Sequence, residues 1–351
     1  MARAPARVVL AANNADVGGG EVMLLATARV LRDLGLEVLV VGPTSPGGVL
    51  EQAGALGVDV HGFAPDRRAY LGALRAWAGE HTDWIWCHGL VPALATAGRS
   101  RRVVHLHQVP APRHRAVARV ARSRAAVTLV PSRAVLDRVP GAEILPNWTP
   151  ELVPVPSRAA DDPVLRIGFI GRLSVDKGLV ELARAVADLD AAEPGRYRLV
   201  LAGDGRFVAP AQADPVTVAL AEVEHLLERR GWVPPAELLG AVDLLAVPSQ
   251  TPEAFGLVAA EAMGARVPCV VSDVGALPEV VGPGHPWVCA AGDAADLARV
   301  LRSCARTAGP QRAVVVEAAH ERWRERFSPA AGAARVERLV RRLGIVPPAA
   351  S

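Results

Sequence analysis

The chain has 351 residues, a length that favours two domains over a single core. Hydrophobic residues make up 51% and charged residues 21%, which excludes a disordered chain. No apolar run approaches the roughly 20 residues of a membrane-spanning helix, and the first apolar run, RVVLAAN, lacks the pattern of a signal peptide. We therefore expect a cytoplasmic protein. Its four cysteines are widely spaced, so neither disulfides nor a zinc site is expected.

Strand-like and helix-like segments alternate along the chain, as is typical of parallel sheets covered by helices on both faces. In the first half we expect strands at Arg7–Ala12, Glu37–Val41, Trp84–His88, Val103–Leu106, Val127–Val130 and Ile144–Leu145. Helices such as Glu21–Leu34 and Arg67–Gly79 lie between them. The segment from Pro146 to Pro163 is rich in proline and is expected to link two domains, because proline disrupts helices and central strands.

The second half repeats this alternation. We expect strands at Leu165–Ile170, Tyr197–Ala202, Val216–Leu220, Asp243–Val247 and Val267–Val271, then helices at 293–307 and 310–326 and an amphipathic tail at Pro329–Leu343. The predicted domains cover residues 1–150 and 163–328, and a helix within 329–351 packs back toward the first domain. The expected class is α/β, with two Rossmann-like parallel-sheet domains that face each other across a ligand-binding cleft.

A glycine-rich turn, NNADVGGGE from Asn13 to Glu21, follows the first expected strand. Glycines at 18, 19 and 20 allow the backbone to approach a ligand closely. A dinucleotide site is the competing interpretation, but the required G-x-G-x-x-G pattern fails at Met23. The second strand also ends in Val41-Gly42-Pro43 without an acidic residue, so we disfavour NAD.

The first turn of the second domain reads GFIGRLSVDKG, from Gly168 to Gly178, and carries Arg172 and Lys177 between a strand and a helix. Lys177 is the one lysine of the chain, and the other 38 basic residues are arginine. Lysine binds phosphate as a compact point charge and arginine as a planar fork. We predict that both residues bind a diphosphate.

Two acids, Glu253 and Glu261, flank an expected helix start at Phe255–Val258. Unpaired amides at a helix start suit an anion, whereas carboxylates need hydroxyl groups to accept from. A nucleotide sugar offers both. Glu253 precedes the helix and suits the sugar, and Glu261 points back along it and suits the ribose. Interaction with the helix dipole would explain Glu253, but Glu261 lies too deep in the helix for that.

These residues resemble the retaining GT-B glycosyltransferases of family 4 (glycosyl transferases group 1). The motif Glu, seven residues, Glu matches Glu253 to Glu261, and the phosphate loop of the family matches Gly171 to Gly178. The resemblance covers most of 165–285 and also includes Gly203-Asp204-Gly205, Gly231-Trp232-Val233 and Pro248-Ser249. It implies that Arg172 and Lys177 hold the diphosphate, that Gly231, Trp232 and Val233 face the base, and that the donor is lined by Glu253, Ala254, Phe255, Gly256, Leu257, Val258 and Glu261.

The same resemblance assigns residues of the first half. It implies that Gly19 and Gly20 bind the donor and that His107 lines the donor-sugar pocket, so that the catalytic residues are His107, Glu253, Arg172 and Lys177. We expect His105 to point to the other side of the sheet or into the core. Gln108 stands where many members have an acid, and Arg266 replaces a usual glycine, which leaves the sugar and the acceptor open.

The predicted function is transfer of a sugar from a UDP- or GDP-sugar to an acceptor hydroxyl, with retention of configuration as the family implies. No metal or other cofactor is expected, because none of the predicted donor-binding segments carries an Asp-x-Asp motif. Three alternatives stay open. The first is a nucleotide-sugar epimerase or a phosphorylase, the second is a non-catalytic nucleotide-sugar-binding subunit, and the third is a glycosidase that uses Glu253 and Glu261 as its carboxyl pair.

The first 150 residues hold 17 basic and 11 acidic side chains, against 22 and 25 in the remainder. The run RHRAVARVARSR, residues 113–124, places Arg115, Arg119 and Arg122 on one helical face. This face is either simply solvated or attracted to an anionic acceptor or membrane surface. Nucleic acid is not an expected partner, because no aromatic residues interleave with these arginines.

Overall fold

The computed structural model describes residues 7–45, 47–154, 163–205 and 208–345. The chain divides into two compact units, one formed by Met1–Asn147 with Ala330–Ser351 and the other by Trp148–Pro329. Within the described ranges, no helix combines the length and the apolar character needed to cross a bilayer. All four cysteines are buried and free, as expected of thiols that serve as small apolar groups.

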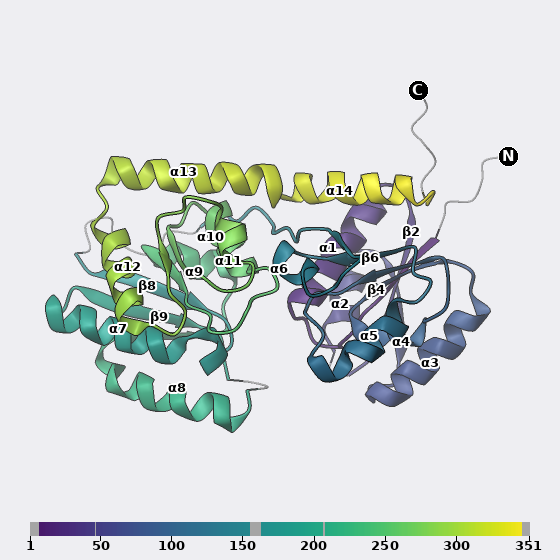
Figure 1. Ribbon diagram of the computed structural model, residues 1–351, viewed down its shortest axis with the longest axis horizontal. Helices are drawn as coiled ribbons and strands as arrows, with labels where there is room; N and C mark the ends of the chain where they lie inside the picture. Colours follow the sequence, from purple (N-terminus) through teal and green to yellow (C-terminus); the bar gives the residue numbers. More distant parts are fainter. Residues whose placement is uncertain (1–6, 46, 155–162, 206–207, 346–351) are drawn as a thin grey trace. The chain divides into compact units, whose positions relative to one another are not determined.

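The first unit, in which Figure 1 labels strands β2, β4 and β6, is built on a seven-stranded sheet. All neighbouring strands are parallel, in the order β3-β2-β1-β4-β5-β6-β7. Its strands are β1 (Arg7–Ala11), β2 (Glu37–Pro43), β3 (Asp59–Phe63), β4 (Trp84–His88), β5 (Arg102–His105), β6 (Val127–Val130) and β7 (Glu143–Ile144). From β1 the chain first adds β2 and β3 on one side of the sheet, and it then adds β4 and the later strands on the other side of β1. The switch point therefore lies between β1 and β4. Such a switch point is where Rossmann-like sheets bind ligands, at the carboxyl ends of the strands.

Helices cover both faces of this sheet. They are α1 (Gly19–Asp33), α2 (Val49–Ala55), α3 (Arg67–Glu80), α4 (Leu90–Ala95), α5 (Arg115–Arg122), α6 (Arg133–Leu136) and α14 (Pro329–Arg342), with a 3-10 turn at Pro112–His114. Helix α1 contacts α2, whereas α3 contacts α4 and α4 contacts α5. Helix α14 buries Val336 and Val340, and Nη2 of Arg342 donates to Oε2 of Glu143 at 2.6 Å.

The second unit has a six-stranded parallel sheet in the order β10-β9-β8-β11-β12-β13. Its strands are β8 (Leu165–Ile170), β9 (Tyr197–Ala202), β10 (Leu227–Gly231), β11 (Leu244–Val247), β12 (Cys269–Ser272) and β13 (Val288–Cys289). Counted within the unit, this order is again 3-2-1-4-5-6, the order of dinucleotide-binding sheets. The switch point therefore lies between β8 and β11.

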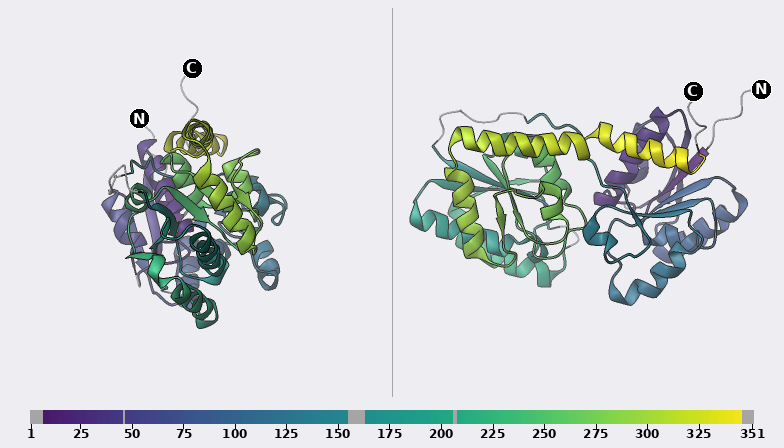
Figure 2. Two further views of the ribbon diagram at one scale, coloured as in Figure 1. Left: turned by 90° about the vertical axis from the view of Figure 1, so that its left-hand side faces the viewer. Right: turned by 45° about the horizontal axis from the view of Figure 1, so that its top comes forward.

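Helices lie on both faces of the second sheet (Figure 2). Each group of helices covers its own apolar core. One core lies under α7 (Leu179–Ala192), α8 (Pro210–Glu222) and α12 (Ala294–Arg306). The other lies under α9 (Pro235–Ala241), α10 (Leu257–Gly264), α11 (Leu277–Val281) and α13 (Gly309–Arg326). Short 3-10 turns at Val175–Lys177 and Glu224–Leu226 complete the unit. The predicted pair of Rossmann-like parallel-sheet domains is confirmed.

One predicted strand is wrong. Val216–Leu220 lies inside helix α8, although the alternation of Val216, Val218 and Leu220 has the period of a strand. The structure buries Val216, Ala219 and Leu220, which are spaced as on a helix face, and leaves Val218 64% exposed. In so short an apolar run, the spacing of the residues does not distinguish a strand from a helix.

Strands β3 and β10 were not predicted. Both are edge strands whose residues are mostly exposed or half-buried, so their sequences lack an apolar signal.

The predicted interdomain linker, Pro146 to Pro163, passes from the first unit into the second at Trp148. Trp148 and Thr149 are buried there, and Nε1 of Trp323 donates to Oγ1 of Thr149 at 2.8 Å. The backbone N–H of Thr149 also donates to the carbonyl of Phe327 at 3.0 Å. Residues 155–162 of the predicted linker lie outside the described residues. The part of the proline-rich segment at Trp148 and Thr149 is therefore anchored in the second unit.

This anchor predicts the effect of T149V. The substitution keeps the side-chain volume but leaves the buried indole N–H of Trp323 without its acceptor, which costs roughly 1–3 kcal/mol of unfolding free energy. Denaturant unfolding of the wild type and the variant measures this loss. In T149V/W323F both partners are removed, so the combined loss should be smaller than the sum of the two single losses. Additive losses would contradict the proposed role of the hydrogen bond.

Candidate functional site

The candidate site of the second unit lies at the switch point of its sheet. The loop after β8 carries Arg172 and Lys177, and the loop after β11 carries Glu253. The two loops touch at Gly178, whose φ is +76°. A Cβ atom at this position would lie 1.8 Å from the carbonyl oxygen of Pro248, so only glycine fits here. This close approach brings the basic loop against the acidic one.

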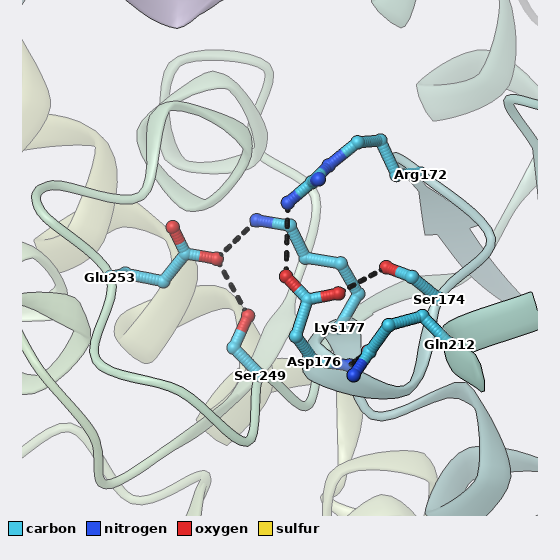
Figure 3. Close-up of polar contacts among 7 residues, drawn as sticks. All are labelled: Arg172, Ser174, Asp176, Lys177, Gln212, Ser249 and Glu253. Carbon is cyan, nitrogen blue, oxygen red and sulfur yellow. Dashed lines mark hydrogen bonds and ion pairs between the residues drawn. The ribbon is translucent and has the colours of Figure 1, made fainter. Parts of the chain in front are cut away.

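An ion pair joins these loops. Nζ of Lys177 lies 2.5 Å from Oε1 of Glu253, and Oγ of Ser249 donates to the same oxygen at 2.7 Å (Figure 3). The backbone carbonyl of Ser249 in turn accepts from Oγ of Ser272 at 2.7 Å. The side chains of Lys177 and Glu253 are 26% and 20% exposed, so each keeps access to a ligand. The two residues predicted to bind different parts of a donor thus bind each other in this structure.

Arg172 is oriented by a neighbour that the sequence did not single out. Its Nη2 lies 2.9 Å from Oδ2 of Asp176, while the guanidinium side chain remains 56% exposed (Figure 3). Asp176 is itself held by Oγ of Ser174, and its backbone N–H donates to Oε1 of Gln212 at 3.1 Å. The loop after β8 thus presents two cations, each paired with a carboxylate.

The backbone of Glu253 is fixed by the loop after β12. The N–H of Ala276 donates to the carbonyl of Glu253 at 2.9 Å. Gly275 adopts φ +60°, and a Cβ there would lie 2.4 Å from both the backbone N and the backbone O of Glu253. Three consecutive loops at the carboxyl edge of the sheet therefore place the Glu253 carboxylate. Gly275 was not predicted as a site residue.

Helix α10 begins at Leu257, two residues after the predicted start at Phe255. Phe255 is instead buried with its ring edge-on to Phe327, at a centroid distance of 5.2 Å. The N-cap is Gly256, with φ +96° and no side chain to satisfy the first turn. The amides of Leu257 and Val258 thus lie in the first turn of the helix, where the positive end of its dipole favours an anion.

Glu261 lies half-buried in the second turn of α10. Burial raises the pKa of its carboxyl to about 7. The loop predicted to face the base follows β10, with Gly231 at φ +63°, Trp232 71% exposed and Val233 packed on the apolar core. An exposed indole at the carboxyl edge of the sheet is available for stacking.

Gly19, Gly20 and His107 belong to the first unit. Gly19 and Gly20 are the first residues of α1, and a Cβ on Gly20 would lie 3.1 Å from Cδ2 of His107. The structure therefore brings Gly20 and His107 together. Nε2 of His107 lies 3.0 Å from Nδ1 of His88, and burial lowers the pKa of His107 to about 3. His107 is thus neutral at physiological pH.

Of the two expected positions of His105, the structure confirms the core and not the other side of the sheet. Its side chain is buried, as expected for the core, but its ring lies 4.0 Å from that of His107, on the same side of the sheet. Residues two apart in a strand point the same way. His88 pairs with His105 in register, so three histidines gather at the ends of β4 and β5.

Solved structures share this fold. The chain superposes on Anabaena Alr3699/HepE, solved in complex with UDP-glucose, with a TM-score of 0.82 and 22% identity over 96% of this chain and 99% of that one. It superposes on sucrose-phosphate synthase of Thermosynechococcus elongatus with a TM-score of 0.80 and 18% identity, over 97% and 99% of the two chains. The two Rossmann-like sheets are those of the GT-B glycosyltransferase fold.

Part of the chain matches a known family. Residues 165–306 match the model of the family Glycosyl transferases group 1, and these residues hold Arg172, Lys177, Glu253 and Glu261. Over these residues the second unit is therefore similar to the group 1 glycosyltransferases.

Curated relatives include a D-inositol 3-phosphate glycosyltransferase of Nocardia farcinica, 36% identical over 34% of this chain and 27% of that protein. A 2-deoxystreptamine glucosyltransferase of Streptomyces kanamyceticus is 37% identical over 39% of this chain and 35% of that protein. The chain thus spans about a quarter to a third of the length of the curated relatives it matches.

The burial of Glu261 predicts a pH effect on stability. Its carboxyl has a pKa of about 7 in the fold against 4.5 unperturbed, so the folded state binds more protons and loses stability as pH rises from about 4.5 to 7. Relative to E261Q, the wild type should lose roughly 1–3 kcal/mol of unfolding free energy between pH 5 and pH 8. Denaturant unfolding of both proteins at several pH values measures this difference, and a constant difference would contradict it.

Proposed function

We propose that the protein transfers a sugar from a nucleoside diphosphate sugar to a hydroxyl of an acceptor. The observation that carries the proposal is the ion pair between Lys177 and Glu253, which spans the switch point of a Rossmann-like sheet next to the start of α10. A cation, a carboxylate and unpaired helix amides at one edge match the phosphates and hydroxyls of such a donor.

Donor binding exchanges partners within this ion pair. The diphosphate takes the ammonium of Lys177 and the exposed guanidinium of Arg172, and it also accepts from the first amides of α10. The Glu253 carboxylate, released from Lys177, then accepts hydrogen bonds from hydroxyls of the sugar. Each ionic group keeps a partner through this exchange, so no charge is left buried and unpaired.

The nucleoside occupies the adjoining residues. Glu261 accepts from the ribose hydroxyls, and the base lies against Gly231, Trp232 and Val233, where the exposed indole of Trp232 offers a stacking surface. The complexes of HepE with UDP and with UDP-glucose support a nucleoside diphosphate sugar as the ligand class of this fold. We propose UDP- or GDP-sugars as donors and a cytoplasmic location for the enzyme.

The chemistry that we propose needs no metal ion. As the bond between the anomeric carbon and the diphosphate breaks, negative charge develops on the leaving oxygen, and Lys177, Arg172 and the amides of α10 are placed to stabilise it. The neutral His107 contributes a hydrogen bond to the donor sugar, with Gly19 and Gly20 allowing close approach. Retention of the anomeric configuration is part of the proposal and rests on the family resemblance.

The remaining alternatives make different predictions. An epimerase converts the donor without releasing free nucleoside diphosphate, and a non-catalytic subunit binds the donor without turnover. A glycosidase needs two carboxyls that flank a bond. Glu253 instead bonds a cation and a hydroxyl. Acceptor-dependent release of nucleoside diphosphate distinguishes transfer from all three.

Cyclitols and aminocyclitols belong in the acceptor panel because of the names of the two curated relatives.

The Lys177 variant tests the donor site. Because a hydrogen bond to a charged group contributes roughly 1.5–3 kcal/mol, K177A should bind UDP or GDP about 10- to 150-fold more weakly. Calorimetric titration measures this loss, and the matched control is R184A, which removes an exposed charge from the following helix α7.

The same preparations test turnover. Acceptor-dependent release of nucleoside diphosphate should persist in EDTA. It should fall in E253Q, which binds the diphosphate at least as tightly as the wild type because Lys177 no longer pairs with a carboxylate. Equal binding by K177A and R184A would remove Lys177 from the donor site. Loss of turnover in EDTA that added Mg²⁺ or Mn²⁺ restores would overturn the metal-free chemistry.

We also propose that the first unit associates with anionic membrane surfaces. Between Asp83 and Asp137 the chain has no acidic residue and nine arginines. The exposed members of this set are Arg101, Arg113, Arg115, Arg119, Arg124 and Arg133, and Val109 and Val120 are also exposed, by 41% and 55%.

One of the three arginines predicted to share an exposed helical face does not lie on it. Arg122 is half-buried and donates to Thr128 and to the carbonyl of Pro140, so it does not share the exposed surface of Arg115 and Arg119. Exposed cations beside exposed valines suit a negatively charged headgroup layer.

Vesicle sedimentation tests this surface. Near an anionic membrane each arginine contributes about 1 kcal/mol, so R115Q/R119Q should bind phosphatidylserine vesicles roughly 30-fold more weakly than the wild type. Phosphatidylcholine vesicles should bind neither protein. The control R67Q/R68Q removes two exposed arginines from the start of α3 and should leave binding unchanged. Equal losses in both variants would show that net charge alone is responsible.

A further inference from the structure

Three histidines of the first unit form a compact cluster at the carboxyl ends of two neighbouring strands. His88 ends β4, His105 ends β5 and is its register partner, and His107 follows two residues later on the same face. Each of the three offers a ring nitrogen, and these nitrogens all lie within 4.8 Å of one another. The donor site that we propose uses His107 but has no role for His88 or His105.

Several nitrogens in this cluster are buried without a hydrogen bond. Across the described part of the chain, no partner within bonding geometry reaches either ring nitrogen of His105, Nδ1 of His107 or the nearby Nε1 of Trp86. Within the cluster, one hydrogen bond joins Nδ1 of His88 to Nε2 of His107 at 3.0 Å. Buried polar atoms are nearly always satisfied by protein, by water or by an ion. A group of orphan imidazole nitrogens therefore points to a ligand.

The chemical state of the rings suits a cation. His88 and His105 are buried and His107 is half-buried, and the hydrogen bond between Nδ1 of His88 and Nε2 of His107 requires that one of these two nitrogens carries no proton. An imidazole nitrogen without a proton is the form that ligates metal ions. An anion, in contrast, would meet no positive charge among these three rings.

We propose that His88, His105 and His107 bind one divalent transition-metal ion of the borderline-soft class to which Zn²⁺ belongs. Three imidazoles are a ligand set that Zn²⁺ accepts, and they leave a fourth position open. Zinc–nitrogen bonds of about 2.0–2.1 Å in a tetrahedral site place the ligand nitrogens roughly 3.4 Å apart. Small rotations of the side chains bring the cluster to that spacing, and half-exposed His107 provides the path of entry.

The ion would replace the hydrogen bond between His88 and His107 and fix the ring of His107. This inference goes beyond the proposed transfer, whose chemistry at Lys177 and Glu253 needs no ion. The experiment reads metal binding directly rather than turnover. Failure of the metal site and failure of the proposed function are therefore separate outcomes.

Cobalt titration of the full-length, EDTA-treated chain tests the proposal. Co²⁺ should bind one equivalent and give the intense visible absorption of a tetrahedral site, and Zn²⁺ should displace it. H105Q and H88Q should each bind at least 100-fold more weakly, because loss of a ligand exceeds the 10- to 100-fold effect of losing an outer-shell partner. The matched control H61Q removes an exposed histidine of the same unit and should titrate like the wild type.

The wild-type titration does not depend on any variant folding. Absence of the tetrahedral band at one equivalent of Co²⁺ would overturn the proposal and leave the cluster as three stacked neutral rings. A band that H61Q weakens as much as H105Q would also overturn it, because surface histidines would then be the ligands. Circular dichroism of H88Q and H105Q without metal shows whether either variant has lost its fold. If one has, the metal affinity of the other tests the proposal.

Discussion

The contact between two loops of the second unit, closed by the ion pair of Lys177 and Glu253, is the interaction on which the candidate donor site depends. It is possible because Gly178 lets the loop after β8 rest on the carbonyl of Pro248. A parallel sheet whose strand order reverses between β8 and β11 sends the following helices to opposite faces and places these loops side by side. The backbone geometry therefore brings the two loops into contact, and the ion pair then holds them together.

Much of this fold follows from short apolar runs between turn-forming residues. The strands β4, β6, β8 and β9 have the predicted bounds because their buried residues are consecutive and clearly delimited. The edge strands β3 and β10 carry no such signal. Helix α8 contains an alternation typical of a strand, and only its packing shows that Val218 faces outward. Local pattern thus predicts the sheet centres, whereas the edges depend on tertiary contacts.

The site residues divide in a similar way. Arg172, Lys177 and Glu253 stand out by type and spacing, but the ion pair joins residues 76 positions apart, and predicting it requires the strand order. Asp176 and Gly275 are common residues in loops, so nothing in the sequence marks them. The histidine cluster likewise depends on the pairing of β4 with β5, which places His88 beside His105.

The mutual neutralisation of the two loops has a consequence for selectivity. In the resting state each cation of the site already has a carboxylate partner, so a bare anion gains little by displacing one. A ligand that brings only phosphate would leave Glu253 without the cation it has lost. A ligand with hydroxyls beside its phosphates compensates both sides of the exchange. At the proposed donor site, the resting ion pair would therefore select against inorganic phosphate, an abundant competitor in any cell that consumes nucleotides.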